Sequence, residues 1–176
     1  PFGYGEYLRF RIEKAGPHSF DSFLRDCGFP AFLEYGDPIR LQSLLRDIVE
    51  RDITIRYELR ETRHLMNLCL FLIAHSGQAF SQQKLSRVLQ IPSAGQVGNY
   101  LEYLEDAYLL LSLPKASYSF KKRIVAPRKY YPIDNGMARA NNPQVAADRG
   151  SRSENKVFLA IRQAGKDTAY DAEKDA

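Results

Sequence analysis

Residues 80–113 read "FSQQKLSRVLQIPSAGQVGNYLEYLEDAYLLLSL", and this stretch decides the fold. Ser81 precedes an apolar segment that ends at Leu89, as expected for a short helix with a serine cap. The following "QIPS" is a turn, and Ser93 with Gln96 three residues later forms a capping box that starts a second helix. Two short helices joined by a tight turn predict a helix-turn-helix.

The second helix has one apolar face. Helical spacing places four of its residues against the core: Val97, Leu101, Leu104 and Tyr108. The same spacing directs three others elsewhere: Gln96, Asn99 and Tyr100. Two glycines, Gly95 and Gly98, weaken the helix but leave room for a close approach to it.

After Leu113 the periodicity changes from helical to extended. The stretches "YLLLSL" (108–113), "KRIVAP" (122–127) and "KYYPIDNG" (129–136) predict strands, the last of them ending in a turn. A helix-turn-helix followed by a β-hairpin is a winged helix. We therefore expect a mainly α fold, a winged helix-turn-helix with a small β-hairpin wing, preceded by a helical region.

Helices are also predicted before this unit. Asp37-Pro38 opens one of them, with Leu41, Leu45 and Val49 on its apolar face. A second helix lies within "RETRHLMNLCLFLIAHSG" (60–77), where Gly77 is a suitable stop. We divide the chain into a helical region at 1–60, a winged-helix domain at 61–140, and a linker with one further helix at 141–176.

Positive charge is concentrated in the predicted wing. The chain has a net charge of +4, yet residues 115–129 hold six basic residues and no acidic one. A basic wing beside a helix-turn-helix is typical of nucleic-acid binding. The predicted phosphate-binding residues are Lys115, Lys121, Lys122, Arg123, Arg128 and Lys129.

The second helix, in contrast, is poor in side chains that read bases. Major-groove recognition uses Arg, Lys, Asn or Gln near the helix start, and here only Gln96 and Asn99 qualify. This predicts DNA binding that is weak, tolerant of sequence and sensitive to salt. Three alternatives stay open: a free-standing transcriptional regulator that reads bases through Gln96 and Asn99, a protein-interaction module whose basic wing meets an acidic surface, and a nuclease, which would need a divalent metal bound near Glu154.

The sequence offers little chemistry. It has no Gly-x-x-x-x-Gly-Lys-Ser/Thr loop, no Gly-x-Ser-x-Gly and no His-Glu-x-x-His, so no catalytic or metal-binding residue is predicted. Ser151 with Glu154 is interpreted as a capping box before the last helix. The two cysteines, Cys27 and Cys69, are expected to be reduced, and the longest apolar run is too short to cross a membrane. We expect a cytoplasmic protein without a membrane partner.

Several motifs, in order along nearly the whole chain, resemble one family. They are "PFGYGEYLRF" (1–10), "CGFPAFL" (27–33), "LLRDIVERDITIRY" (44–57), "VGNYLEYLEDAYLLLSL" (97–113), "KYYPIDNGMARA" (129–140) and "RGSRSENKVFLAIRQAG" (149–165). They are similar to segments of prokaryotic ATP-binding proteins of the AAA/STAND type. Those proteins have a P-loop ATPase core, then a winged-helix domain, then a PD-(D/E)XK nuclease-like domain.

The resemblance implies an ATPase core before Pro1 and most of a nuclease-like domain after Ala176. ATP and magnesium would belong to that core, since the Walker motifs are absent from this sequence. Glu154 aligns with a helix glutamate of the nuclease-like domain, but the Glu-(Val/Ile)-Asp-Phe strand of that domain is missing. The chain is thus expected to be a non-catalytic module that couples the ATPase core, its partner in cis, to a further partner such as DNA.

Overall fold

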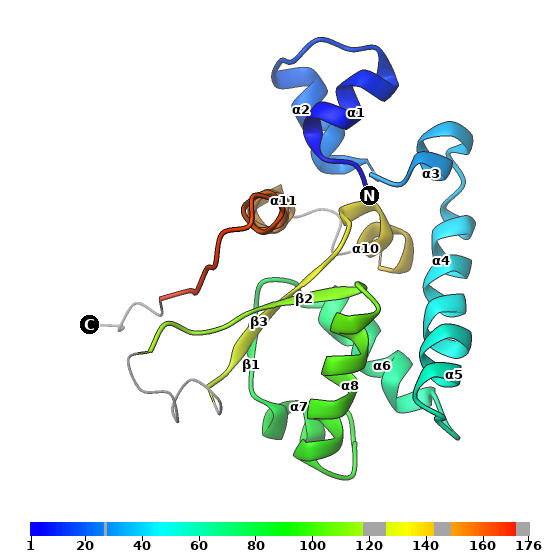
Figure 1. Ribbon diagram of the computed structural model, residues 1–176, viewed down its shortest axis with the longest axis vertical. Coiled ribbons are helices and arrows are strands. Elements are labelled where there is room, and N and C mark those ends of the chain that lie inside the picture. Colours follow the sequence, from blue (N-terminus) through cyan, green and yellow to red (C-terminus); the bar gives the residue numbers. More distant parts are fainter. Residues whose placement is uncertain (27, 118–125, 143–148, 172–176) are drawn as a thin grey trace.

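The computed structural model describes residues 1–26, 28–117, 126–142 and 149–171. The chain is mainly helical and has one small antiparallel sheet of three strands (Figure 1). The first helices are α1 (Tyr4–Arg11), α2 (Pro17–Arg25), α3 (Pro30–Tyr35), α4 (Pro38–Asp47), the π-helix η1 (Ile48–Ile53) and α5 (Thr54–Arg56). They are followed by α6 (Arg63–Ala74), β1 (Ala79–Phe80), α7 (Gln82–Val88), α8 (Ala94–Asp106), β2 (Leu110–Leu113), β3 (Arg128–Pro132), α10 (Asn135–Asn141) and α11 (Arg149–Gln163).

The main hydrophobic core lies between α4, η1, α6, α7, α8 and the sheet. Five α6 residues at helical spacing are fully buried in it: Leu65, Leu68, Cys69, Leu72 and Ile73. Val49 and Ile53 of η1 enter the same core, so helices on both sides of residue 60 share it.

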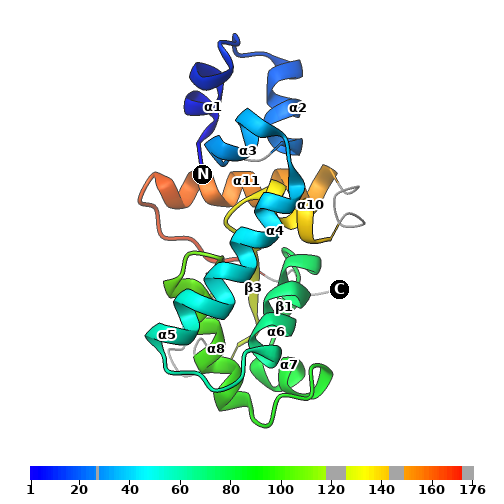
Figure 2. The same ribbon diagram turned by 90° about the vertical axis from the view of Figure 1, so that its right-hand side faces the viewer.

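The α1–α2 pair lies at one end of the molecule and α7 at the other (Figure 2). The division of the chain into three parts stays a prediction.

The predicted helix caps are largely confirmed. The Asp37 carboxylate accepts from the Ile39 N–H, and the Ser81 hydroxyl accepts from the Lys84 N–H at 3.2 Å. The Ser93 hydroxyl accepts from the Gln96 N–H at 3.1 Å. In a full capping box the Gln96 side chain would also bond to the Ser93 backbone. Its amide instead donates to the Tyr100 hydroxyl at 2.7 Å.

The predicted orientations of two tyrosines in this region are wrong. Tyr100 is buried, with only 6% of its surface exposed, whereas Tyr108 is 70% exposed. The reason for the second error is that α8 ends at Asp106. Tyr108 then adopts a left-handed conformation with φ of 53°, which turns its side chain out of the helical register.

The strands pair in the order β1-β3-β2, with β3 antiparallel to both neighbours. Strands predicted around residues 108–113 and 129–136 are confirmed as β2 and β3. Of the strand predicted at 122–127, residues 122–125 lie outside the described part, Ala126 forms a bend, and β3 begins only at Arg128. In the described residues, no helix has the length and apolar character that a membrane span needs.

Candidate nucleic-acid interface

The two predicted basic residues of β3, Arg128 and Lys129, point to opposite faces of the sheet, because side chains alternate along a strand. Arg128 and Tyr130 face the helices, where Tyr130 enters the core and the Arg128 guanidinium donates to the Ser112 hydroxyl at 3.5 Å. Lys129 and Tyr131 face the opposite side, where both contact Glu154 of α11. Figure 1 shows β3 running between α11 and the α6–α8 group. Neighbouring cations of the predicted site are thus separated by the sheet.

A cleft of about 550 Å³ lies on the helix side of the sheet, between α7, the start of α8 and β3. Its lining residues offer amides, hydroxyls and one guanidinium: Phe80, Ser81, Gln82, Gln83, Ala94, Ala126, Arg128 and Tyr130. These groups donate hydrogen bonds to phosphate, sugar or base oxygens, and none of them is a carboxylate that would repel a phosphate.

Two further cations lie on α7, the helix whose first residues line this cleft. Lys84 is exposed, and its ammonium lies 5.1 Å from the centre of the Phe80 ring, which itself lines the cleft. Arg87 is exposed in the last turn of the same helix. Neither residue was among the predicted site residues, since the predicted phosphate contacts were drawn from the wing alone. The periodic signal was present: both residues lie away from Leu85, the buried residue of this helix.

The two residues predicted to read bases lie on the first turns of α8. Asn99 is exposed, while Gln96 is half-buried and already donates to Tyr100. Gly98 leaves room for a close approach, as predicted, but the group that approaches it belongs to the same chain, the Gln82 side chain of α7. A Cβ at Gly98 would lie 3.2 Å from the amide nitrogen of Gln82 on α7. The glycine therefore allows α7 and α8 to pack closely.

On the opposite side of the sheet, Lys129 is held within the chain. Its ammonium lies 3.0 Å from a Glu154 carboxylate oxygen, and this oxygen also accepts from the Tyr131 hydroxyl at 2.7 Å. Burial, and then the bond to Glu154, raise the pKa of the Tyr131 phenol, so the hydroxyl remains a donor. The predicted capping box at Ser151 and Glu154 is wrong, because α11 begins at Arg149 and Ser151 already lies inside the helix.

Lys115 is half-buried and pairs through its backbone with Tyr170 in a parallel β-bridge. The Ala116 N–H donates to the Tyr170 carbonyl at 2.7 Å, and the Tyr170 N–H donates to the Pro114 carbonyl at 3.0 Å. The other predicted cations, Lys121, Lys122 and Arg123, lie outside the described residues. The structure therefore brings Arg128 to the cleft and places Lys129 and Lys115 against the C-terminal segment.

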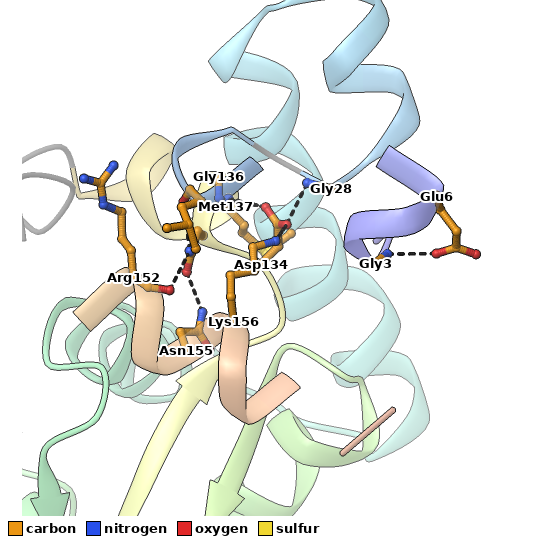
Figure 3. Close-up of polar contacts among 11 residues, drawn as sticks. Gly3, Glu6, Gly28, Asp134, Gly136, Met137, Arg152, Asn155 and Lys156 are labelled. Carbon is orange, nitrogen blue, oxygen red and sulfur yellow. Dashed lines mark hydrogen bonds and ion pairs between the residues drawn. The ribbon is translucent and has the colours of Figure 1, made fainter. Parts of the chain in front are cut away.

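A buried polar cluster joins the N-terminal helices to α10 and α11 (Figure 3). The Asp134 carboxylate, which is fully buried, accepts from the backbone N–H groups of Gly28 at 2.8 Å, Gly136 at 2.8 Å and Met137 at 3.1 Å. Lys156 completes it, with its ammonium 3.5 Å from the carboxylate and 4.2 Å from the Phe23 ring centre.

Two asparagines extend this cluster. The Asn135 amide donates to the carbonyls of Leu24 and Arg152, and its own oxygen accepts from the Asn155 amide at 2.6 Å (Figure 3). The sequence interpretation missed the cluster, since "IDNG" was taken as a turn alone. An aspartate directly before "NGMARAN" is a helix N-cap signal, and Asp134 caps α10 in this way.

The described residues provide no grouping of three or more His, Cys, Asp or Glu side chains that could hold a metal ion. Cys69 lies in the core, where burial raises the pKa of its thiol to about 12 and leaves it protonated at neutral pH.

Fold and site together define a small, mainly helical domain with a three-stranded antiparallel sheet and a polar cleft. The chain belongs to the family described as "Domain of unknown function (DUF8612)", whose model matches residues 19–146. It is 28% identical over 145 positions to an uncharacterized protein of Haemophilus influenzae, covering 78% of this chain and 36% of that protein. It is also 28% identical over 184 positions to an uncharacterized protein of Methanocaldococcus jannaschii, covering 94% of this chain and 41% of that protein.

No solved structure matches the chain significantly. The chain spans about two fifths of the length of these two relatives.

Proposed function

We propose that the chain is a non-catalytic winged-helix module that binds nucleic-acid phosphates without strong sequence preference, and that it couples this binding to the ATP-binding core of a larger protein. The order α6–β1–α7–α8–β2–β3, with strand order β1-β3-β2, supports the winged-helix assignment. A helix-turn-helix places its second helix in the major groove, and here that helix is α8.

The observation that carries the proposal is the cleft between α7, α8 and β3. It holds the Arg128 guanidinium among amide and hydroxyl donors, and the Lys84 ammonium lies against Phe80, which lines the cleft. Phosphate contacts supply affinity and orientation, whereas base contacts supply specificity. Since Gln96 is engaged by Tyr100, Asn99 alone is exposed among the two predicted base-reading residues. Sequence-tolerant binding follows.

Coupling is supported by the fold and by the family resemblance. The cluster around Asp134 ties the α2–α3 connection to α10 and α11 through buried, hydrogen-bonded groups, which is the kind of contiguous link that coupling would use. The relatives are more than twice as long as the matched part, which leaves space for further domains in those proteins. The motifs resemble AAA/STAND-type proteins, in which an ATPase core stands before this domain.

Fluorescence anisotropy with a labelled random-sequence duplex tests the phosphate-binding part. If the interface engages about six phosphates, the binding constant falls roughly a thousandfold between 50 and 200 mM salt. R128Q is expected to weaken binding about fivefold for every sequence and to reduce the salt slope by about one phosphate. R46Q is the matched control, because Arg46 is an exposed arginine on α4 and its loss changes the net charge equally. Equal effects of R128Q and R46Q would contradict the assignment of the cleft.

A second candidate is a protein-interaction module. The side of the sheet that carries Lys129 and Tyr131 already holds a protein segment, α11 together with Tyr170, which favours protein contacts on that face. Absence of any retention on duplex DNA at 50 mM salt would decide for this candidate. Loss of binding to one preferred sequence in a variant with Gln96 and Asn99 changed to Ala would instead indicate a sequence-reading regulator.

A further inference from the structure

The C-terminal segment holds the β2–β3 pair at three points. Glu154 of α11 binds Lys129, the Tyr131 ring packs 4.5 Å from that of Phe158, and Tyr170 pairs with residues 114–116. The Tyr170 hydroxyl also donates to the Pro127 carbonyl at 2.8 Å, so one residue bridges both arms of the hairpin. These contacts cover the face of the sheet that lies away from α7 and α8.

Lys129 is the cation most affected by these contacts. Its side chain is only 26% exposed, with Glu154 on one side and the Tyr170 ring centre 5.4 Å from its ammonium. Arg128, one residue earlier, donates to the neutral Ser112 hydroxyl and lines the cleft. The two adjacent cations therefore differ in availability to a ligand. Lys129 is paired with the Glu154 carboxylate, whereas Arg128 contacts only the neutral Ser112 hydroxyl among the contacts described above.

Glu154 is itself held in place. The Tyr131 hydroxyl donates to the oxygen that contacts Lys129, and the other carboxylate oxygen packs against Gly77, where an added Cβ would be 3.3 Å away. A glutamate at an unconstrained surface position exchanges freely between solvent and a lysine, and such pairs contribute little. A glutamate fixed by a tyrosine and by packing loses less side-chain freedom when it binds the lysine, so it competes better with an external anion.

We infer that Glu154 is a built-in competitor of nucleic acid for Lys129, and that opening of the Glu154–Lys129 pair offers this lysine as a further phosphate contact on the face of the sheet opposite the cleft. The inference rests on the proposed nucleic-acid binding and concerns its regulation. Nucleic-acid binding and the opening of this pair are then linked in both directions, since a ligand that binds the open state better shifts the equilibrium toward it.

E154Q is the primary test, measured by anisotropy with the random duplex at several salt concentrations. Freeing one lysine is expected to raise the binding constant about twofold to fivefold at 50 mM salt, the range of one exposed ion pair. The slope of log K against log salt should steepen by about 0.9, the value for one added phosphate contact. E34Q is the matched control, because Glu34 is exposed on α3 and its loss changes the net charge by the same amount.

K129Q separates competition from a general charge effect. In the wild-type background K129Q should change affinity less than about twofold, since the lysine is already neutralised. In the E154Q background the same change should remove the whole gain. Thermal unfolding of each variant verifies that it is folded before binding is measured.

The outcomes are distinguishable. If wild type binds duplex and E154Q behaves like E34Q, the competition is refuted while the proposed function stands. If K129Q weakens binding equally in both backgrounds, Lys129 is free in the wild type and the inference is again refuted. If neither wild type nor E154Q binds at 50 mM salt, the proposed function fails and the inference fails with it.

Discussion

Replacement of Asp134 by asparagine should strongly destabilise the fold, although the two side chains have nearly the same shape. The asparagine oxygen can still cap α10 by accepting from Gly136 and Met137, as the carboxylate does. The amide nitrogen would then face the Gly28 N–H, which is a donor, and Lys156 would keep its charge in a site where its side chain is only 7% exposed. The change therefore removes a specific set of interactions and leaves the helix cap intact.

The expected magnitude follows from the burial of the pair. Breaking a buried ion pair by removing one partner typically costs about 3–5 kcal/mol, because the other charge is left uncompensated. We expect D134N to lower the free energy of unfolding by about 4 kcal/mol, a large share of the roughly 5–15 kcal/mol available to a domain. K156M should cost only about 1–2 kcal/mol, since the Asp134 carboxylate retains three N–H donors.

A double-mutant cycle measured by urea denaturation tests this reasoning. Tyrosine fluorescence can follow the transition, because the chain has 11 tyrosines and no tryptophan. In the D134N background K156M removes the stranded charge, so the double variant should be about 2 kcal/mol more stable than the sum of the single changes implies. Additivity within about 0.5 kcal/mol would show that Asp134 and Lys156 are not energetically coupled and would refute the argument.

Two other expectations concern stability. Burial raises the pKa of Cys69 from 9.0 to about 12, so the stability that this thiol supports is complete below pH 9 and is lost as pH rises from 9 toward 12. Between pH 8 and 10 the free energy of unfolding, measured by urea denaturation, should therefore fall by about 1 kcal/mol less in C69A than in wild type. Equal decreases in the two proteins would argue against a buried thiol. G77A should lower the free energy of unfolding by about 1–2 kcal/mol and the melting temperature by a few degrees. The reason is that Gly77 has φ of +80° and an added Cβ would meet the Glu154 side chain. An unchanged melting temperature would contradict the strained geometry.

Periodicity and capping predicted much of the helical fold. The serines before α7 and α8 are each followed by apolar residues at helical spacing, and both cap as expected. These signals are local, since the donor and acceptor lie within three residues. The end of α8 was more difficult to predict, because Tyr108 adopts a left-handed conformation in a position where glycine or asparagine is the usual signal. The helical pattern therefore appeared to continue for two residues beyond its end.

The candidate site was predicted only in part, and the reason is the alternation of side chains in a strand. From the sequence, Arg128 and Lys129 belong to one basic run, but a single residue step moves a side chain to the other face of a sheet. Which of the two meets a ligand depends on what covers each face. That is decided by α11 and Tyr170, which are more than 20 residues away along the chain.

The same distance explains why the Asp134 cluster was not foreseen. Asp134 accepts from Gly28, 106 residues earlier, and Asn135 donates to Leu24, 111 residues earlier. Both side chains have local signatures of a turn or helix cap, and that role is real. The carboxylate does more than cap, however, because it also accepts from Gly28 and its charge compensates the buried Lys156 ammonium. A lysine on a helix that sequence alone would leave in solvent thus becomes one of the points where α11 is fastened to the rest of the chain.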